Sequence, residues 1–138
     1  IVVSGDVAGA SIFLGIGDKS GTTDNNGTDL MVIGGTYTSG PVTLGLQTTE
    51  IDASAVGSDR DRLAAAISFA VNENTSISYG MSTVEFEGNN TDQEDSGVAI
   101  SHTMGSMTVA AFHNTSENVS GTSGTDDSVT EISLAFAF

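Results

Sequence analysis

Apolar residues alternate with small or polar residues along most of the chain. From Glu131 to Phe138 the even positions carry isoleucine, leucine or phenylalanine, whereas the odd positions carry glutamate, serine or alanine. The segment from Arg62 to Val71 repeats this pattern with its apolar residues at odd positions. A period of two predicts β-strands with one apolar face, and no apolar stripe of helical period interrupts the pattern. The sequence therefore predicts an all-β fold.

The alternation predicts eight strands, joined by connections that are short and long in turn. The full strands fall near residues 8–18, 29–38, 41–51, 60–71, 75–87, 95–103, 107–115 and 128–138, and residues 1–4 are predicted to be the end of a further strand. Short connections are predicted at 3–8, 39–41, 72–74 and 104–106, and long polar ones at 18–28, 52–59, 88–95 and 116–127. This organisation predicts an antiparallel meander whose short turns lie at one end. Val84 and Phe86 fall out of phase with Ile77 and Tyr79, which predicts a β-bulge near Thr83.

The composition excludes several classes of protein. The chain has 18 acidic residues, three cationic ones and a formal net charge of −15. A nucleic-acid-binding protein needs a basic surface to neutralise phosphates, so this class is excluded. The chain also contains no cysteine, and it therefore has no disulfide, thiolate metal site or cysteine nucleophile. Because charged residues make up only 15% of the chain and hydrophobic ones 38%, we expect an ordered structure.

The two faces of the predicted strands are unlike those of a water-soluble sheet. The face opposite the apolar one carries glycine, alanine, serine and threonine instead of the usual charged residues. Asp6 and Glu73 alone lie at the short-turn end, and the other end holds fourteen acids, namely Asp18, Asp24, Asp29, Glu50, Asp52, Asp59, Asp61, Glu87, Asp92, Glu94, Asp95, Glu117, Asp126 and Asp127. Each strand is close to the ~9–11 residues that a tilted strand needs to cross a bilayer. This plan predicts an antiparallel transmembrane β-barrel of the outer-membrane type.

Three segments carry a resemblance to a known family. The strand from Glu131 to Phe138, with its final phenylalanine, resembles the terminal strand of Gram-negative outer-membrane proteins. The hairpins at 35–46 and 103–109 resemble the short-turn hairpins of general-diffusion porins, most closely the acidic alphaproteobacterial porins of the Rhodobacter type. Such porins have sixteen strands, and the resemblance implies that residues 1–138 are the C-terminal half of one barrel domain. It also implies a homotrimer in contact with outer-membrane lipid and lipopolysaccharide. Phe136 and Phe138 would be read by the barrel-assembly machinery.

Three functions are compatible with these patterns. The first is passive diffusion of small hydrophilic solutes through a water-filled channel, with a preference for cations because the acids gather at one mouth. The second is a complete small eight-stranded barrel with a structural or adhesive role. The third is a secreted calcium-dependent β binding module. No enzyme is predicted, because His102 and His113 are the only imidazoles and no Ser-His-Asp arrangement accompanies them.

The alternation also predicts which residues line the pore. These residues occupy the small, polar face: Thr43, Gln47, Arg62, Ser68, Ser76, Ser78, Ser82, Glu131 and Ser133. Arg62 has a second interpretation, as a residue that anchors the neighbouring loop by pairing with Asp59 or Asp61. The resemblance implies instead that a wall arginine shapes the field across the pore.

Two further sets of residues have predicted positions. Clustered carboxylates favour calcium, and the candidate ligands are Asp92, Glu94, Asp95, Asp126 and Asp127, although no calcium-binding motif accompanies them. No other cofactor is predicted. The aromatic residues Tyr37, Phe69, Tyr79 and Phe138 fall near the short-turn end, where they predict a membrane-interface girdle. A second girdle near the long connections would contain Phe13, Phe86 and Phe112.

Overall fold

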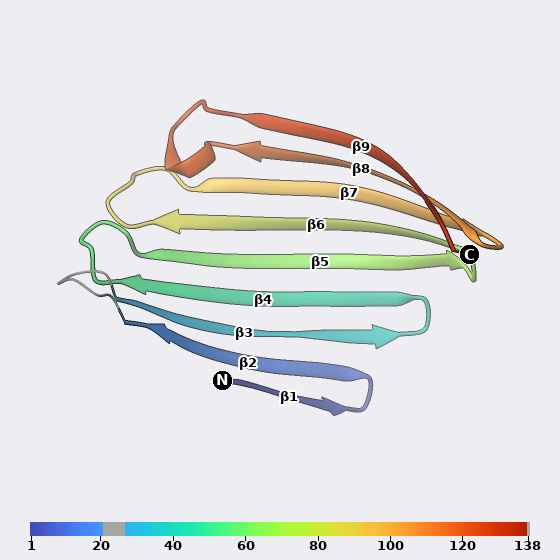
Figure 1. The fold of residues 1–138 in the computed structure, drawn as a ribbon, viewed down its shortest axis with the longest axis horizontal. Coiled ribbons are helices and arrows are strands. Elements are labelled where there is room, and N and C mark those ends of the chain that lie inside the picture. The colour runs from blue at the N-terminus through green and yellow to red at the C-terminus, as the bar shows by residue number, and fades with distance from the viewer. Residues whose placement is uncertain (21–26, 138) are drawn as a thin grey trace.

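The computed structural model describes residues 1–20 and 27–137, which form one antiparallel sheet of nine strands (Figure 1). The strands are β1 (Val2–Val7), β2 (Ala10–Lys19), β3 (Thr28–Ser39), β4 (Val42–Ala53), β5 (Arg60–Asn72), β6 (Thr75–Phe86), β7 (Gln93–Met104), β8 (Met107–Glu117) and β9 (Asp127–Phe136). Each strand pairs only with its neighbours in sequence. A 3₁₀ turn, η1 (Val119–Gly121), precedes β9. Among the described residues, no helix has the length and apolar content needed to cross a membrane.

The antiparallel meander is confirmed, and the sheet has a ninth strand besides the eight full strands predicted. Residues Val2–Val7, which included a predicted short connection, form β1 and pair with β2 from Val2 opposite Gly15 to Val7 opposite Ala10. The strand predicted at residues 1–4 is confirmed and extends to Val7, although Ser4, Gly5 and Asp6 interrupt the apolar alternation and give no strand signal. Pairing with the well-formed strand β2 supplies its hydrogen bonds.

Two-residue turns join the two strands of each hairpin at one end of the sheet, drawn on the right in Figure 1. Gly40 (φ 57°) and Gly105 (φ 62°) begin two of them, and in the β1–β2 turn both Ala8 (φ 49°) and Gly9 (φ 84°) have positive φ. Tight hairpins favour such left-handed conformations because their twist matches that of the flanking strands. The short connections predicted at 39–41, 72–74 and 104–106 are thus confirmed, as are the long ones near 52–59, 88–95 and 116–127. The long connection predicted at 18–28 lies largely outside the described residues.

The predicted bulge near Thr83 is wrong. The register between β5 and β6 is continuous from Arg60 opposite Phe86 to Ala70 opposite Ser76, and it shifts only between Ala70 and Asn72, beside the short turn. Val84 and Phe86 are therefore out of phase with the apolar face because they lie on the other face of a regular strand.

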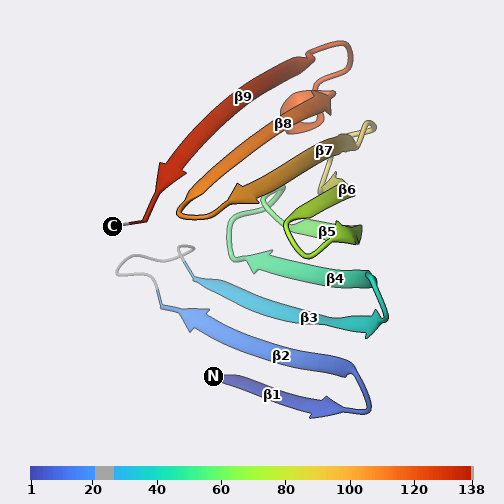
Figure 2. The ribbon, with the colours of Figure 1, turned by 90° about the vertical axis from the view of Figure 1, so that its right-hand side faces the viewer.

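The exposure of the two faces is the reverse of that in a water-soluble protein. Among the described residues no hydrophobic side chain is buried, and Leu46, Ile67 and Ile132 are 60%, 45% and 76% exposed. In β4 the odd positions from Thr43 to Ala53 are half-buried, whereas the even positions from Leu44 to Asp52 are exposed. Figure 2 shows the sheet strongly curved, and crowding of the small, polar face indicates that it is the concave one. The apolar face is convex.

The sheet is open, and β1 and β9 form its two edges. Both edge strands run toward the short-turn end, as their arrows in Figure 1 show. Each edge leaves backbone groups without a partner in the sheet.

Candidate pore-lining face

The cross-strand register places every residue predicted to line the pore on the concave face. Directly paired residues of an antiparallel sheet share a face, so each row can be followed from strand to strand. Three concave rows contain the predicted residues: Thr43, Ser68, Ser78, Ala99, Phe112 and Glu131; Ser76, Ser101, Ala110 and Ser133; and Gln47, Ala64, Ser82 and Asp95. Arg62 lies on the same face, opposite Thr49 and Val84.

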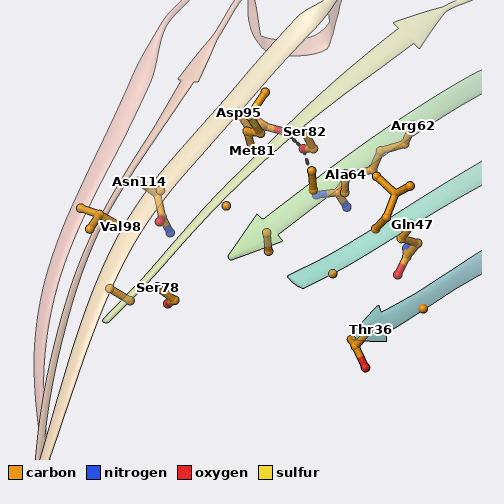
Figure 3. A pocket seen from close by; sticks show the side chains of 18 of the residues that line it. Thr36, Gln47, Arg62, Ala64, Ser78, Met81, Ser82, Asp95, Val98 and Asn114 are labelled. Carbon is orange, nitrogen blue, oxygen red and sulfur yellow. Dashed lines mark hydrogen bonds between the residues drawn. The ribbon is translucent and has the colours of Figure 1, made fainter. Parts of the chain in front are cut away.

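An open hollow of about 490 Å³ lies on this face, across the middle strands (Figure 3). Its lining includes Gln47, Arg62, Ser82, Asp95 and Asn114, together with glycines and alanines. Small residues leave room above the sheet, while the amide, hydroxyl and charged groups can be hydrated. The hollow therefore has the chemistry of a water-filled passage.

Arg62 belongs to a hydrogen-bonded network across β5, β6 and β7. Its Nη2 donates to Ser82 Oγ at 3.1 Å, and Ser82 Oγ donates to Asp95 Oδ2 at 3.0 Å. Gln93 Nε2 donates to the other carboxylate oxygen, Asp95 Oδ1, at 2.8 Å. The dashed lines in Figure 3 follow the two bonds of Ser82.

The loop-anchoring interpretation of Arg62 does not match these contacts. Asp59 Oδ1 accepts a hydrogen bond from the Ala53 amide at 2.7 Å. In the strand register Asp61 lies directly opposite Glu50 and Glu85. It is therefore on the convex face, away from Arg62. The relevant partner, Ser82, is 20 residues from Arg62 in sequence.

The predicted upper aromatic girdle is wrong, since all three of its phenylalanines lie on the concave face. Phe86 is opposite Arg60, whose guanidinium carbon is 5.5 Å from the ring centroid. Phe13 is opposite Gly34, and Phe112 is opposite Ala99. Of the girdle predicted near the short turns, Tyr37, Phe69 and Tyr79 are 50%, 45% and 47% exposed on the convex face, but Tyr79 lies opposite Ile67, near the middle of β5. This girdle stays a prediction. Phe138 lies outside the described residues.

The charged residues divide between the two faces in a way that the acidic count did not reveal. All three cationic residues, Lys19, Arg60 and Arg62, lie on the concave face. Three rows of acids near the long connections lie on the convex face: Asp18, Asp29 and Asp52; Glu50, Asp61 and Glu85; and Glu94 with Glu117. The concave acids in the strands are Asp6, Asp95, Asp127 and Glu131. Many acids at this end therefore do not point into the lumen.

The five candidate calcium ligands do not converge. Glu94 and Asp95 are adjacent and therefore face opposite sides of β7, while Asp92 is exposed in the preceding connection. Asp126 Oδ1 accepts from the Asn118 amide, and Asp127 Oδ1 accepts from the Ser128 amide. Within residues 1–20 and 27–137, no group of three or more acids or histidines is arranged to hold a metal ion. Calcium binding stays a prediction without geometric support.

The histidines make simple pairs with threonine on the convex face. His102 Nδ1 is 2.7 Å from Thr75 Oγ1, and His113 Nδ1 is 2.7 Å from Thr130 Oγ1. His113 lies in the middle of β8. Of the two residues predicted to signal assembly, Phe136 is 54% exposed at the end of β9 and Phe138 lies outside the described residues. Recognition by the assembly machinery stays a prediction.

An exposed apolar face of this size is unusual in water, and comparison with known proteins identifies a family in which such a face is expected. Residues 5–135 match the family model of the Gram-negative porins. Searches of curated proteins and of solved structures give no match. Porins are β-barrels of the bacterial outer membrane, whose outward face is apolar and whose interior is polar. The chain belongs to the Gram-negative porin family.

Proposed function

We propose that the chain forms the wall of a water-filled, cation-preferring channel for passive diffusion of small hydrophilic solutes. Family membership supports an outer-membrane channel and favours it over an enzyme. The observation that carries the proposal is the contrast between the faces. Around the hollow the concave face is mostly small or polar, apart from Phe13, while the convex face exposes most of the large apolar residues. A secreted binding module would place that apolar face in water, where burial would be expected.

Charge supports the preference for cations. The concave acids Asp6, Asp95, Asp127 and Glu131 outnumber the concave cations, and the net charge of the whole chain is −15. Carboxylates near a narrow aqueous passage raise the local concentration of cations and lower that of anions. Those on the convex face act from farther away and through more screening.

In planar bilayers under a KCl gradient, we expect a reversal potential displaced toward that of K⁺. Glu131→Gln, on the concave face, should lower the K⁺ preference at least about twofold, because a unit charge ~10 Å from an ion in water contributes about 0.4 kcal/mol. Asp61→Asn removes the same charge from the convex face and should have a much smaller effect. A reversal potential toward Cl⁻ would refute cation preference, and a folded protein that carries no current would refute the channel.

We also propose that these strands are part of a larger barrel, specifically its C-terminal half, within a porin of the acidic alphaproteobacterial type. The support is the direction of the edges. Outer-membrane barrels join antiparallel neighbours, and unpaired backbone groups in lipid are costly. Because β1 and β9 are parallel, an antiparallel closure requires an odd number of further strands. A sixteen-stranded barrel satisfies this condition, whereas closure of these nine strands alone does not.

The convex face contains polar pairs that support contact between copies in a homotrimer, with lipid and lipopolysaccharide around the rest. Besides the pair of His113 and Thr130, the hydroxyls of Ser96 and Thr115 are 2.9 Å apart. These pairs lie on β7, β8 and β9, between the middle of the strands and the end with the long connections. Polar side chains are unfavourable in the hydrocarbon region, and a protein surface covers them at lower cost.

The double variant His113→Leu/Thr130→Val should form a smaller fraction of trimer than the wild type. The measurement is native mass spectrometry of the full-length protein in detergent. The physical reason is that the polar contacts between copies are lost while the barrel interior is untouched. Thr83→Val, also on the convex face but on β6, is the matched control and should leave the trimer intact. An unchanged trimer combined with a more stable barrel would show that this patch faces lipid.

A further inference from the structure

We propose that Ser82 is a positioning residue for ion selectivity, because it holds the Arg62 guanidinium against the wall beside Asp95. The inference rests on the proposed channel function and deepens it. Ser82 is 6% exposed, and it is the only buried polar or charged residue in the described part of the chain. Arg62 and Asp95, by contrast, remain accessible from the lumen side.

The position of Ser82 in the sheet explains why it can bridge the two charges. It lies on β6, directly opposite Ala64 of β5 and Asp95 of β7. Arg62 lies one row nearer the long connections, and its side chain reaches diagonally to Ser82. Long side chains span such diagonal neighbours across a strand pair. Ala64, directly opposite Ser82, has only a methyl side chain and leaves this path open.

The chemistry of a hydroxyl fits both contacts. Guanidinium only donates hydrogen bonds and an ionised carboxylate only accepts them, whereas a serine hydroxyl accepts and donates at the same time. Ser82 therefore accepts from Arg62 at 3.1 Å and donates to Asp95 at 3.0 Å. Both bonds involve a charged partner and are stronger than neutral ones. Gln93 donates to Oδ1 of Asp95 and so leaves Oδ2 directed at Ser82.

The bridge changes what a passing ion experiences. With Ser82 in place, the charges of Arg62 and Asp95 lie two hydrogen bonds apart and act on the lumen as a dipole, whose field falls off faster than that of a single charge. Without the hydroxyl, Asp95 keeps Gln93 while the guanidinium loses its partner and extends into the water of the lumen. A free cation there repels K⁺ and attracts Cl⁻.

The test is the K⁺/Cl⁻ permeability ratio of the full-length protein in planar bilayers. Ser82→Ala changes no charge, yet it should lower the ratio about twofold or more, because freeing Arg62 brings a unit charge closer to the permeating ions. Ser78→Ala is the matched control, since Ser78 lies on the same strand and face and its hydroxyl makes no hydrogen bond within the described chain. Ser78→Ala should keep the wild-type ratio.

A double-mutant cycle separates this role from a general structural one. If Ser82 acts through Arg62, then Ser82→Ala should have no effect once Arg62→Gln is present. Should Ser82→Ala fail to fold, Ser82→Cys takes its place, because a thiol has nearly the same shape as the hydroxyl but is only a weak hydrogen-bond donor and acceptor. Ser82→Cys should then lower the ratio in the same direction.

The failures of the two proposals are distinguishable. A wild-type protein that folds but carries no current defeats the proposed channel. The role of Ser82 alone is defeated if the wild type conducts but Ser82→Ala has the same permeability ratio as Ser78→Ala. It is also defeated if Ser82→Ala still lowers the ratio in the Arg62→Gln background. A folded Ser82→Cys that keeps the wild-type ratio defeats it as well.

Discussion

Ile67→Lys should destabilise the folded barrel by about 2–4 kcal/mol, the cost of a lysine on the lipid face near the bilayer midplane. Ile67 lies near the middle of β5 on the convex face, between Leu44 and Tyr79, and is 45% exposed. Its ammonium group would enter hydrocarbon, where no water or counterion is available. The measurement is the free energy of unfolding from urea titration in lipid vesicles.

The adjacent residue supplies the control. Ser68 lies on the concave face, opposite Thr43 and Ser78, so Ser68→Lys places the same charge in water and should change stability by less than ~0.5 kcal/mol, as exposed substitutions usually do. A similar loss for both variants would mean that both faces meet the same medium. That result would contradict the assignment of the convex face to lipid.

Gly34→Ala should cost about 1–3 kcal/mol, the usual penalty for extra volume at a tightly packed position. A Cβ atom at Gly34 would lie 2.5 Å from the Phe13 ring and 2.9 Å from the Leu46 carbonyl oxygen. The ring can turn away, but the backbone oxygen cannot move without disturbing the pairing of β3 and β4. Chemical denaturation in detergent or vesicles measures the loss.

Gly45→Ala is the matched substitution, since Gly45 lies on the same face and a Cβ there would meet Thr36 Cγ2 at an ordinary 3.7 Å. It should be neutral or stabilising by up to about 1 kcal/mol, because alanine loses less backbone freedom on folding than glycine. If the two variants behave alike, the close approach of Phe13 and Leu46 to Gly34 is not a constraint on stability.

Much of the fold could be predicted because the period of two is a local property. The strand containing Ile132 shows its faces without reference to any other strand, and the turn at Gly105 is marked by its own residues. Only the start of β1 could be predicted in this way, from Val2 and Val3. Its residues around Gly5 have no alternation, and they are extended because β2 offers them a hydrogen-bonding edge.

The site was predictable as a face but not as a set of contacts. Alternation assigns Arg62 and Ser82 to the same side of the sheet, yet it does not reveal that they touch, because that depends on the register of two strands. The same limit explains the errors at the long-connection end. Counting acids near Asp61 shows where charge gathers along the barrel axis, whereas only the phase of each strand shows whether it points to lipid or lumen.

The pairing of each strand with its neighbours in sequence has a consequence for how the wall is assembled. Every hairpin closes only a short loop, and the entropy lost on loop closure grows with loop length. Structures dominated by such local contacts reach the native state faster than those that join distant segments. The sheet can therefore lengthen by one hairpin at a time, each new pair using the last edge as its template, and no step must wait for a remote part of these strands.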